Sequence, residues 1–295
     1  MPEASWEKLN NQVVTLYQKG EYAQAIKIAE QAFKLAVQTK GADHPDVATS
    51  LNNLAELLMA QDRNEEALGM LQRALAVSEK SMGSSHAQIA VCLTNLAELY
   101  LALKRDNEAI PLYRRALTIN ERELGPMHSE VISALFTLGN IYFQQDKYQE
   151  AELLLKRALT AITKSAGPNS PQLVRFQVAL GRSYIALHRL TDAENLLKEA
   201  FALSSKTQGD NHDETIAALH DLAEVYISMQ KFPEAILLLK QELAVIEQKH
   251  GATSPQLAKM LFRVGNFFKL TGNEQEANMM LQRALKILQD SRQDE

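Results

Sequence analysis

Apolar residues recur along this chain three or four positions apart, which is the spacing of one face of an α-helix. In the segment 45–60 they are Val47, Leu51, Leu54, Ala55 and Leu58. The segment 64–81 continues the rhythm with Ala67, Leu71, Ala74 and Leu75. The alternation of apolar and polar residues that marks a strand does not occur, and short polar links such as 61–63 and 145–147 separate the segments. The pattern predicts an all-α protein made of helix–turn–helix pairs.

Three columns of small residues repeat every 42 positions in a single phase. The glycine column is Gly41, Gly83, Gly125, Gly167, Gly209 and Gly251. One alanine column is Ala25, Ala67, Ala109, Ala151, Ala193, Ala235 and Ala277. A second alanine column, interrupted by Glu242, is Ala32, Ala74, Ala116, Ala158, Ala200 and Ala284. A constant period of this length is typical of repeats that stack into an α-solenoid.

The period divides the chain into seven copies, which we expect to form a single domain over residues 1–295. The predicted copies are 1–40, 41–82, 83–124, 125–166, 167–208, 209–250 and 251–290, followed by a short polar tail at 291–295. Within a copy, Ala67 is expected to meet the first helix at Ala55, because helices approach closely only where side chains are small. The Ala74 column is expected to contact the next copy. Gly20 and Gly272 stand where a helix end favours a left-handed residue.

Composition and charge narrow the function classes. Hydrophobic residues make up 46% of the 295 residues, which is enough for a core, and the net charge is −5 with acids and bases interspersed. No basic patch indicates nucleic acid, no basic amphipathic segment indicates a membrane surface, and no run of 18 apolar residues could span a bilayer. The lone cysteine, Cys92, is expected in the core and fits a reducing compartment. Residues 1–20 lack the apolar stretch of a signal peptide. We therefore expect a cytoplasmic protein, or an exported one if a signal was removed.

The repeat resembles the tetratricopeptide repeat. The matching residues are Leu54-Ala55, Leu58 and Ala67-Leu71-Ala74, and in the next copy Leu96-Ala97, Tyr100 and Ala109-Ala116. The 42-residue form, with GADHPDVATSLNNLAELL at 41–58, is similar to the repeats of kinesin light chains and of their bacterial and nephrocystin-like relatives. This resemblance implies a right-handed superhelix of seven repeats that binds proteins or peptides. A heptad coiled coil, which a kinesin light chain would also carry, is absent from the sequence, so a motor subunit is not indicated.

Histidines at one loop position of the repeat could suggest a metal site, but helix capping explains them better. His44, His86, His128 and His212 alternate there with Ser170 and Ser254, and proline follows three of these residues. Serine replaces histidine readily as a cap and poorly as a metal ligand. The acidic cluster 210–214 lacks the spacing of a calcium loop. No phosphate loop, dinucleotide fingerprint or nucleophile motif occurs. We therefore expect no metal, no cofactor and no enzymatic activity.

In tetratricopeptide arrays the first helix of each pair lines the concave groove, so the resemblance places the candidate partner-binding residues there. Mapped onto this sequence, they are Asn10, Asn52, Glu56, Thr94, Glu98, Phe136, Asn140, Phe143, Arg175, Arg182, His220, Phe262 and Asn266. The light-chain family has an asparagine ladder at one column that binds the backbone of an extended peptide. Here only Asn10 and Asn52 keep it, with Thr94 as a partial substitute. Phenylalanines in the later copies offer apolar anchors instead.

The expected groove residues also differ in charge along the chain. Glu7, Glu56 and Glu98 belong to the first copies, whereas Arg175, Arg182, Lys259 and Lys269 belong to later ones. This favours an elongated partner with its basic part against the first three copies. Two alternatives stay open: binding through the convex face, and a homo-oligomeric solenoid. Apolar residues of the helix 276–290, among them Met279, Met280 and Leu285, favour self-association through the seventh copy.

Overall fold

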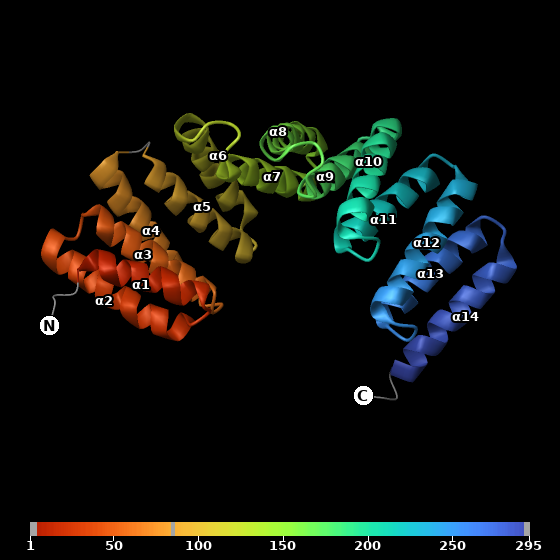
Figure 1. Ribbon diagram of the computed structural model, residues 1–295, viewed down its shortest axis with the longest axis horizontal. Helices are drawn as coiled ribbons and strands as arrows, with labels where there is room; N and C mark the ends of the chain where they lie inside the picture. Colours follow the sequence, from red (N-terminus) through yellow and green to blue (C-terminus); the bar gives the residue numbers. More distant parts are fainter. Residues whose placement is uncertain (1–4, 84–85, 292–295) are drawn as a thin grey trace. The chain divides into compact units, whose positions relative to one another are not determined.

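The computed structural model describes residues 5–83 and 86–291, and this part of the chain contains fourteen α-helices and no β-strand (Figure 1). The first seven helices are α1 (Trp6–Gln18), α2 (Tyr22–Lys40), α3 (Pro45–Met59), α4 (Asn64–Met82), α5 (Ala87–Ala102), α6 (Asp106–Glu123) and α7 (Ser129–Gln144). The others are α8 (Tyr148–Ala166), α9 (Leu173–Ala186), α10 (Leu190–Gln208), α11 (Asp213–Ser228), α12 (Phe232–His250), α13 (Pro255–Leu270) and α14 (Glu274–Ser291). The all-α prediction is confirmed.

The helices group into two compact units, Met1–Ile141 and Tyr142–Glu295. Unit 1 holds α1 to α6 and most of α7, and unit 2 holds α8 to α14. The organisation of all 295 residues as a single domain stays a prediction. Residues 292–295 of the predicted tail lie outside the described residues.

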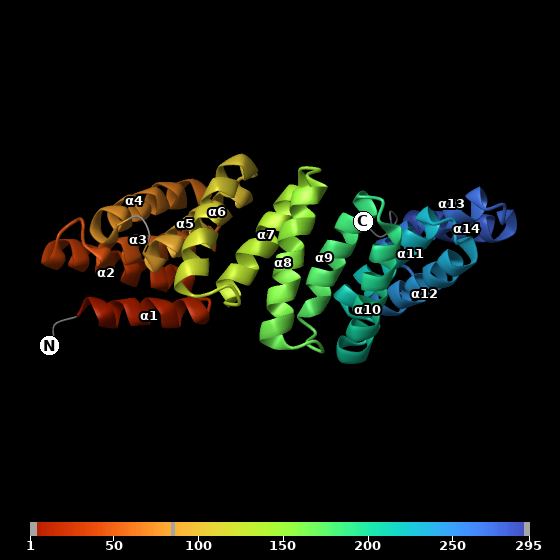
Figure 2. The same ribbon diagram turned by 90° about the horizontal axis from the view of Figure 1, so that it is seen from above.

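Each repeat is a hairpin of two helices, and successive hairpins stack within each unit. Helix α3 packs on its partner α4, and α4 packs on α5 of the next repeat. The first helices also touch one another, α1 with α3 and α3 with α5 in unit 1, and α9 with α11 in unit 2 (Figure 2). We call the surface formed by the first helices of the hairpins in a unit the first-helix wall of that unit. This is the α-solenoid that the 42-residue period predicts.

Small residues bring the two helices of a hairpin together, as the sequence predicts. Ala55 and Ala67 are fully buried in one apolar cluster with Leu71. In a later repeat, a Cβ added at Gly181 would lie 2.8 Å from Cδ2 of Leu197, so the helices are already in contact there. The second alanine column also behaves as predicted, because Ala74 packs with Val47 of its own repeat and Cys92 of the next.

The loop histidines are helix caps, as predicted. Nδ1 of His44 accepts a hydrogen bond from the backbone N–H of Asp46 at 3.1 Å, and Nδ1 of His86 accepts one from Gln88 at 3.2 Å. His128 and His212 repeat this contact. Ser170 is an exception to the predicted cap followed by a helical proline. Pro171 lies in a turn and α9 begins only at Leu173, although Ser170 Oγ still accepts from Gln172 N–H at 3.3 Å.

The turns between paired helices share one left-handed residue. Gly20 has φ 75° and Gly272 has φ 80°, as their position in the repeat predicts. In the repeats between them, non-glycine residues adopt φ values of 57–58° at the same position: Asp62, Lys104, Asp146, His188 and Gln230. The turn geometry is therefore common to the repeats, and glycine is used at only two of these sites.

Candidate functional site

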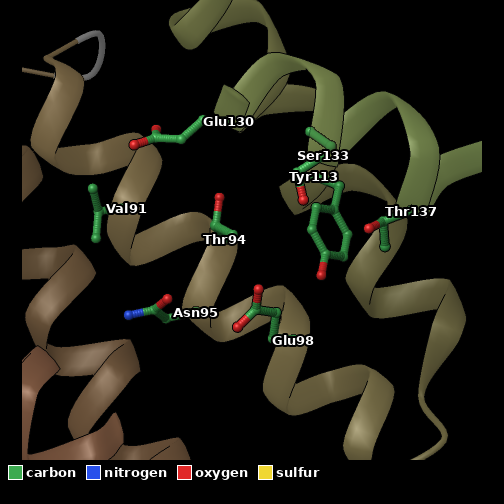
Figure 3. Close-up of a pocket in the computed structure, with 9 residues that line it drawn as sticks. Val91, Thr94, Asn95, Glu98, Tyr113, Glu130, Ser133 and Thr137 are labelled. Carbon is green, nitrogen blue, oxygen red and sulfur yellow. The ribbon is translucent and has the colours of Figure 1, made fainter. Parts of the chain in front are cut away.

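A hollow on the first-helix wall of unit 1 lies between α5 and α7, and Tyr113 of α6 also lines it (Figure 3). It has a volume of about 260 Å³. We call it the acidic pocket, and its lining residues are Val91, Thr94, Asn95, Glu98, Tyr113, Glu130, Ser133, Ala134 and Thr137. Two of them, Thr94 and Glu98, are predicted site residues, so the structure brings this part of the predicted site together.

Glu98 is the charged residue of the pocket whose carboxylate has no partner in the described part of the chain. Its carboxylate is exposed, and among the described residues it has neither an ion pair nor a hydrogen bond. Partial desolvation by the surrounding helices, and then the charge of Glu56, raise the pKa of Glu98 above its ordinary value. The pocket lining includes no lysine or arginine. The site is therefore electrostatically suited to a positive group.

Tyr113 forms the floor of the acidic pocket. Its side chain is only 3% exposed, and its hydroxyl makes no hydrogen bond within the described residues. Burial, and then the nearby Glu98 carboxylate, raise the pKa of Tyr113, so the phenol stays protonated. Figure 3 shows the ring between the side chains of α5 and α7, with its hydroxyl on the side where Glu98 lies.

A polar cluster lies next to the pocket on the same wall. Nδ2 of Asn52 donates to Oε1 of Glu56 at 2.8 Å, and Nδ2 of Asn95 donates to the same carboxylate oxygen. Burial raises the pKa of Glu56, although these two hydrogen bonds act in the opposite direction. Nδ2 of Asn53 donates to Oδ1 of Asn10 at 2.7 Å. The two asparagines kept from the family ladder are thus engaged within the protein.

One column of polar residues, on the first helices of both units, was not predicted from the sequence. The column that includes Asn53, Asn95, Asp221 and Arg263 links each of these residues to the preceding repeat. Its recurrence every 42 residues could have revealed it, but the family pattern drew attention to the neighbouring column. The two remaining predicted residues of unit 1, Phe136 and Asn140, are half-buried on α7.

In unit 2 two of the predicted basic residues, Arg175 and Arg182, have partners of their own. Nε of Arg182 donates to Oδ2 of Asp221 at 2.6 Å, and the guanidinium of Arg175 stacks over the ring of Phe176 at 4.8 Å. Desolvation raises the pKa of the buried Asp221 carboxyl even though Arg182 opposes the shift. Reversing Arg182 to glutamate would place a second carboxylate beside Asp221, so that variant tests stability as well as binding.

The other predicted residues of unit 2 are also largely used within it. Nδ1 of His220 lies 2.8 Å from Oε1 of Glu242, which is 3% exposed. Phe143 packs against Tyr148 at 5.4 Å between ring centroids, and Phe262 packs on the cluster of Leu257 and Ala284. Asn266 is exposed. The unit therefore offers fewer free polar groups on its first helices than its sequence suggests.

Two further hollows in unit 1 are larger. One, of about 760 Å³, lies between α1 and α2, and the other, of about 550 Å³, lies beside α2 and α4. In the second hollow Glu66 is paired with Arg63, and Arg73 stacks over Phe33. These two side chains have partners within the protein, unlike Glu98.

Residues 5–83 and 86–291 contain no group of three or more His, Cys, Asp or Glu side chains placed to hold a metal ion. No helix in the same ranges is long and apolar enough to cross a bilayer. Cys92 is 2% exposed, with its Sγ 3.7 Å from Oγ of Ser78, and burial raises the pKa of its thiol. It belongs to the core, as predicted.

Solved structures with the same architecture are similar to this chain. TPR-like repeats from Podosopora anserina, described as those of a kinesin light chain, share 26% identity over 70% of this chain and 97% of that chain, with a TM-score of 0.60. BtubC (BKLC) from P. vanneervenii shares 18% identity over 82% and 92% of the two chains, with a TM-score of 0.64. RapI in its apo form shares 13% identity over 98% and 99%, with a TM-score of 0.62. The last two support the fold alone.

The sequence also matches a family model. No curated protein matches the chain. The tetratricopeptide repeat model, however, matches residues 7–80, 46–122, 90–164 and 172–248, which together cover most of the sequence. These matches agree with the helical hairpins, the small-residue columns and the stacked first helices. The chain belongs to the tetratricopeptide repeat family, and its repeats are of the kinesin-light-chain-like kind.

Proposed function

We propose that this chain is a non-catalytic scaffold that binds a protein or an extended peptide along its first-helix walls. The observation that carries the proposal is the acidic pocket, where the carboxylate of Glu98 and the hydroxyl of Tyr113 have no partner among the described residues. Stacked repeats present such walls to partners, and unsatisfied polar groups in a concave site give specificity. The lone buried thiol of Cys92 fits a cytoplasmic location.

The proposal is tested by affinity capture from an extract of the source organism, with quantitative mass spectrometry. Thr94→Arg places a large side chain at the mouth of the acidic pocket, whereas Asn107→Arg adds the same side chain to an exposed site on α6. Proteins captured by the wild type should be lost with Thr94→Arg and kept with Asn107→Arg. Equal capture by both variants would assign binding to another face. Circular dichroism checks that both variants fold.

A second candidate is a homo-oligomeric solenoid. Apolar side chains on α13 and α14 are largely exposed, with Leu270 at 86%, Met279 at 58% and Leu285 at 51%. All three belong to one helical hairpin, and a contiguous apolar surface there would favour protein–protein contact. Light scattering across a concentration series separates the candidates. A chain that stays monomeric at high concentration removes this one, and a dimer abolished by serine at these three positions supports it.

A further inference from the structure

We propose that the acidic pocket binds a basic side chain, a lysine or an arginine, of the bound partner. The inference rests on the proposed function and specifies which type of partner side chain enters the acidic pocket. It follows from three features of the pocket: its charge, the unpaired hydroxyl of Tyr113 and its size.

The charge of the pocket selects a cation. Glu98 and Glu130 both line it, and Glu56 lies close enough to Glu98 to act on its ionisation. Glu130 accepts a hydrogen bond from Asn120 at 3.1 Å, whereas Glu98 has no partner in the described residues. A bound ammonium or guanidinium would give Glu98 the charge-assisted hydrogen bond that the protein does not provide. An acidic or phosphorylated group would instead meet two carboxylates.

Tyr113 is an independent indication of a ligand. At the position equivalent to Tyr113, the four repeats that follow carry leucine: Leu155, Leu197, Leu239 and Leu281. These leucines pack against neighbouring helices. Tyrosine adds a hydroxyl to this apolar position. This hydroxyl has no hydrogen-bond partner among the described residues and borders the pocket, where a ligand can reach it. Its oxygen can accept a hydrogen bond from an ammonium or guanidinium that Glu98 also holds.

The size and walls of the pocket fit one side chain. A volume of about 260 Å³ equals roughly nine water molecules at ~30 Å³ each, which is enough for one long side chain. Val91, Ala134 and the Tyr113 ring offer apolar contact to the methylene stem. The hydroxyls of Thr94, Ser133 and Thr137 can accept the remaining hydrogen bonds of the cationic head. Long basic side chains are suited to such a mixed environment.

The first experiment selects peptides from a displayed library of random twelve-residue sequences, on the wild type and on Glu98→Gln in parallel. Wild-type selections should be enriched in lysine or arginine at one fixed position, and Glu98→Gln selections should lose that enrichment. Peptides without a common basic position would overturn the inference while leaving peptide binding, and so the proposed function, in place. If the library yields no binders, the inference also fails, and the capture experiment with Thr94→Arg judges the proposed function separately.

The second experiment measures the affinity of one selected peptide and of its analogue with norleucine at the basic position, by calorimetry. Loss of a charged hydrogen bond should weaken the basic peptide about tenfold in Glu98→Gln, and Tyr113→Phe should weaken it less. The norleucine analogue should bind the wild type and both variants equally. The matched control Glu65→Gln, on an exposed site of α4, should bind both peptides as the wild type does. Equal affinity of Glu98→Gln and wild type for the basic peptide would overturn the inference.

Discussion

Nη1 of Arg263 donates to both carboxylate oxygens of Glu242, at 3.1 and 3.2 Å, and Glu242 stands where every other repeat carries alanine. Nη2 of Arg263 reaches Glu224 at 2.8 Å, and Nδ1 of His220 lies close to both Glu242 and Arg263. The interruption in the alanine column is therefore a buried carboxylate held by an ionic network that ties α13 to α11 and α12.

Replacing Arg263 by methionine should destabilise unit 2 by about 3 kcal/mol, because removing one partner leaves a buried carboxylate unpaired. Arg263→Met/Glu242→Ala, which restores the alanine of the other repeats, should recover most of the loss. Urea unfolding followed by circular dichroism measures both variants. A double variant no more stable than Arg263→Met would mean that Glu242 contributes mainly through packing.

Ala109→Leu should destabilise unit 1 by about 1–3 kcal/mol, the usual cost of overpacking. Ala109 is fully buried early in α6, and its column closes the helical hairpin. Neighbouring repeats stabilise each other through their interfaces, so the loss should extend beyond one hairpin. The exposed Ala76→Leu on α4 is the matched control. Identical melting curves for Ala109→Leu and the wild type would contradict the close helix contact.

His86→Ala/His128→Ala should lower stability by about 1 kcal/mol per cap, whereas His86→Ser/His128→Ser should stay within about 0.5 kcal/mol of the wild type. The reason is that Nδ1 of each histidine accepts a backbone hydrogen bond at a helix start, which a serine hydroxyl can also accept. Thermal unfolding measures the difference. Stoichiometric zinc that binds the wild type and is lost in the serine variant would reveal a metal site instead.

Glu98→Gln should raise the melting temperature at pH 7, and the gain should disappear in acid. The pKa of Glu98 in the folded protein lies above the ordinary 4.5 because of desolvation and Glu56. The folded state therefore holds this proton more tightly than the unfolded chain, and stability falls as pH rises from 4.5 through the raised pKa. Glutamine removes that loss at neutral pH. Glu65→Gln, measured at pH 7 and pH 4, is the control, and a lower melting temperature of Glu98→Gln at pH 7 would contradict the sign.

The sequence by itself determined the helices, their pairing and their caps. A 42-residue period imposes the same local environment on every copy, so one interpretation of Ala67, Leu71 or His44 applies to the residues that share its column. Short-range physics decides these features: the helical spacing of apolar residues, the need for small residues where helices touch, and the unpaired N–H groups at helix starts.

Only the tertiary structure decided which wall residues remain free to bind. Arg182 and His220 look available for binding in the sequence. In the structure, however, Arg182 donates a hydrogen bond to Asp221, and His220 contacts Glu242, each from a neighbouring helix. Glu98 looks like any other wall carboxylate, yet the packing of α5, α6 and α7 leaves it without a partner among the described residues, beside the hydroxyl of Tyr113. Contacts between residues about 40 positions apart depend on how one repeat is placed on the next, and the period reveals that the repeats stack without specifying which side chains then meet.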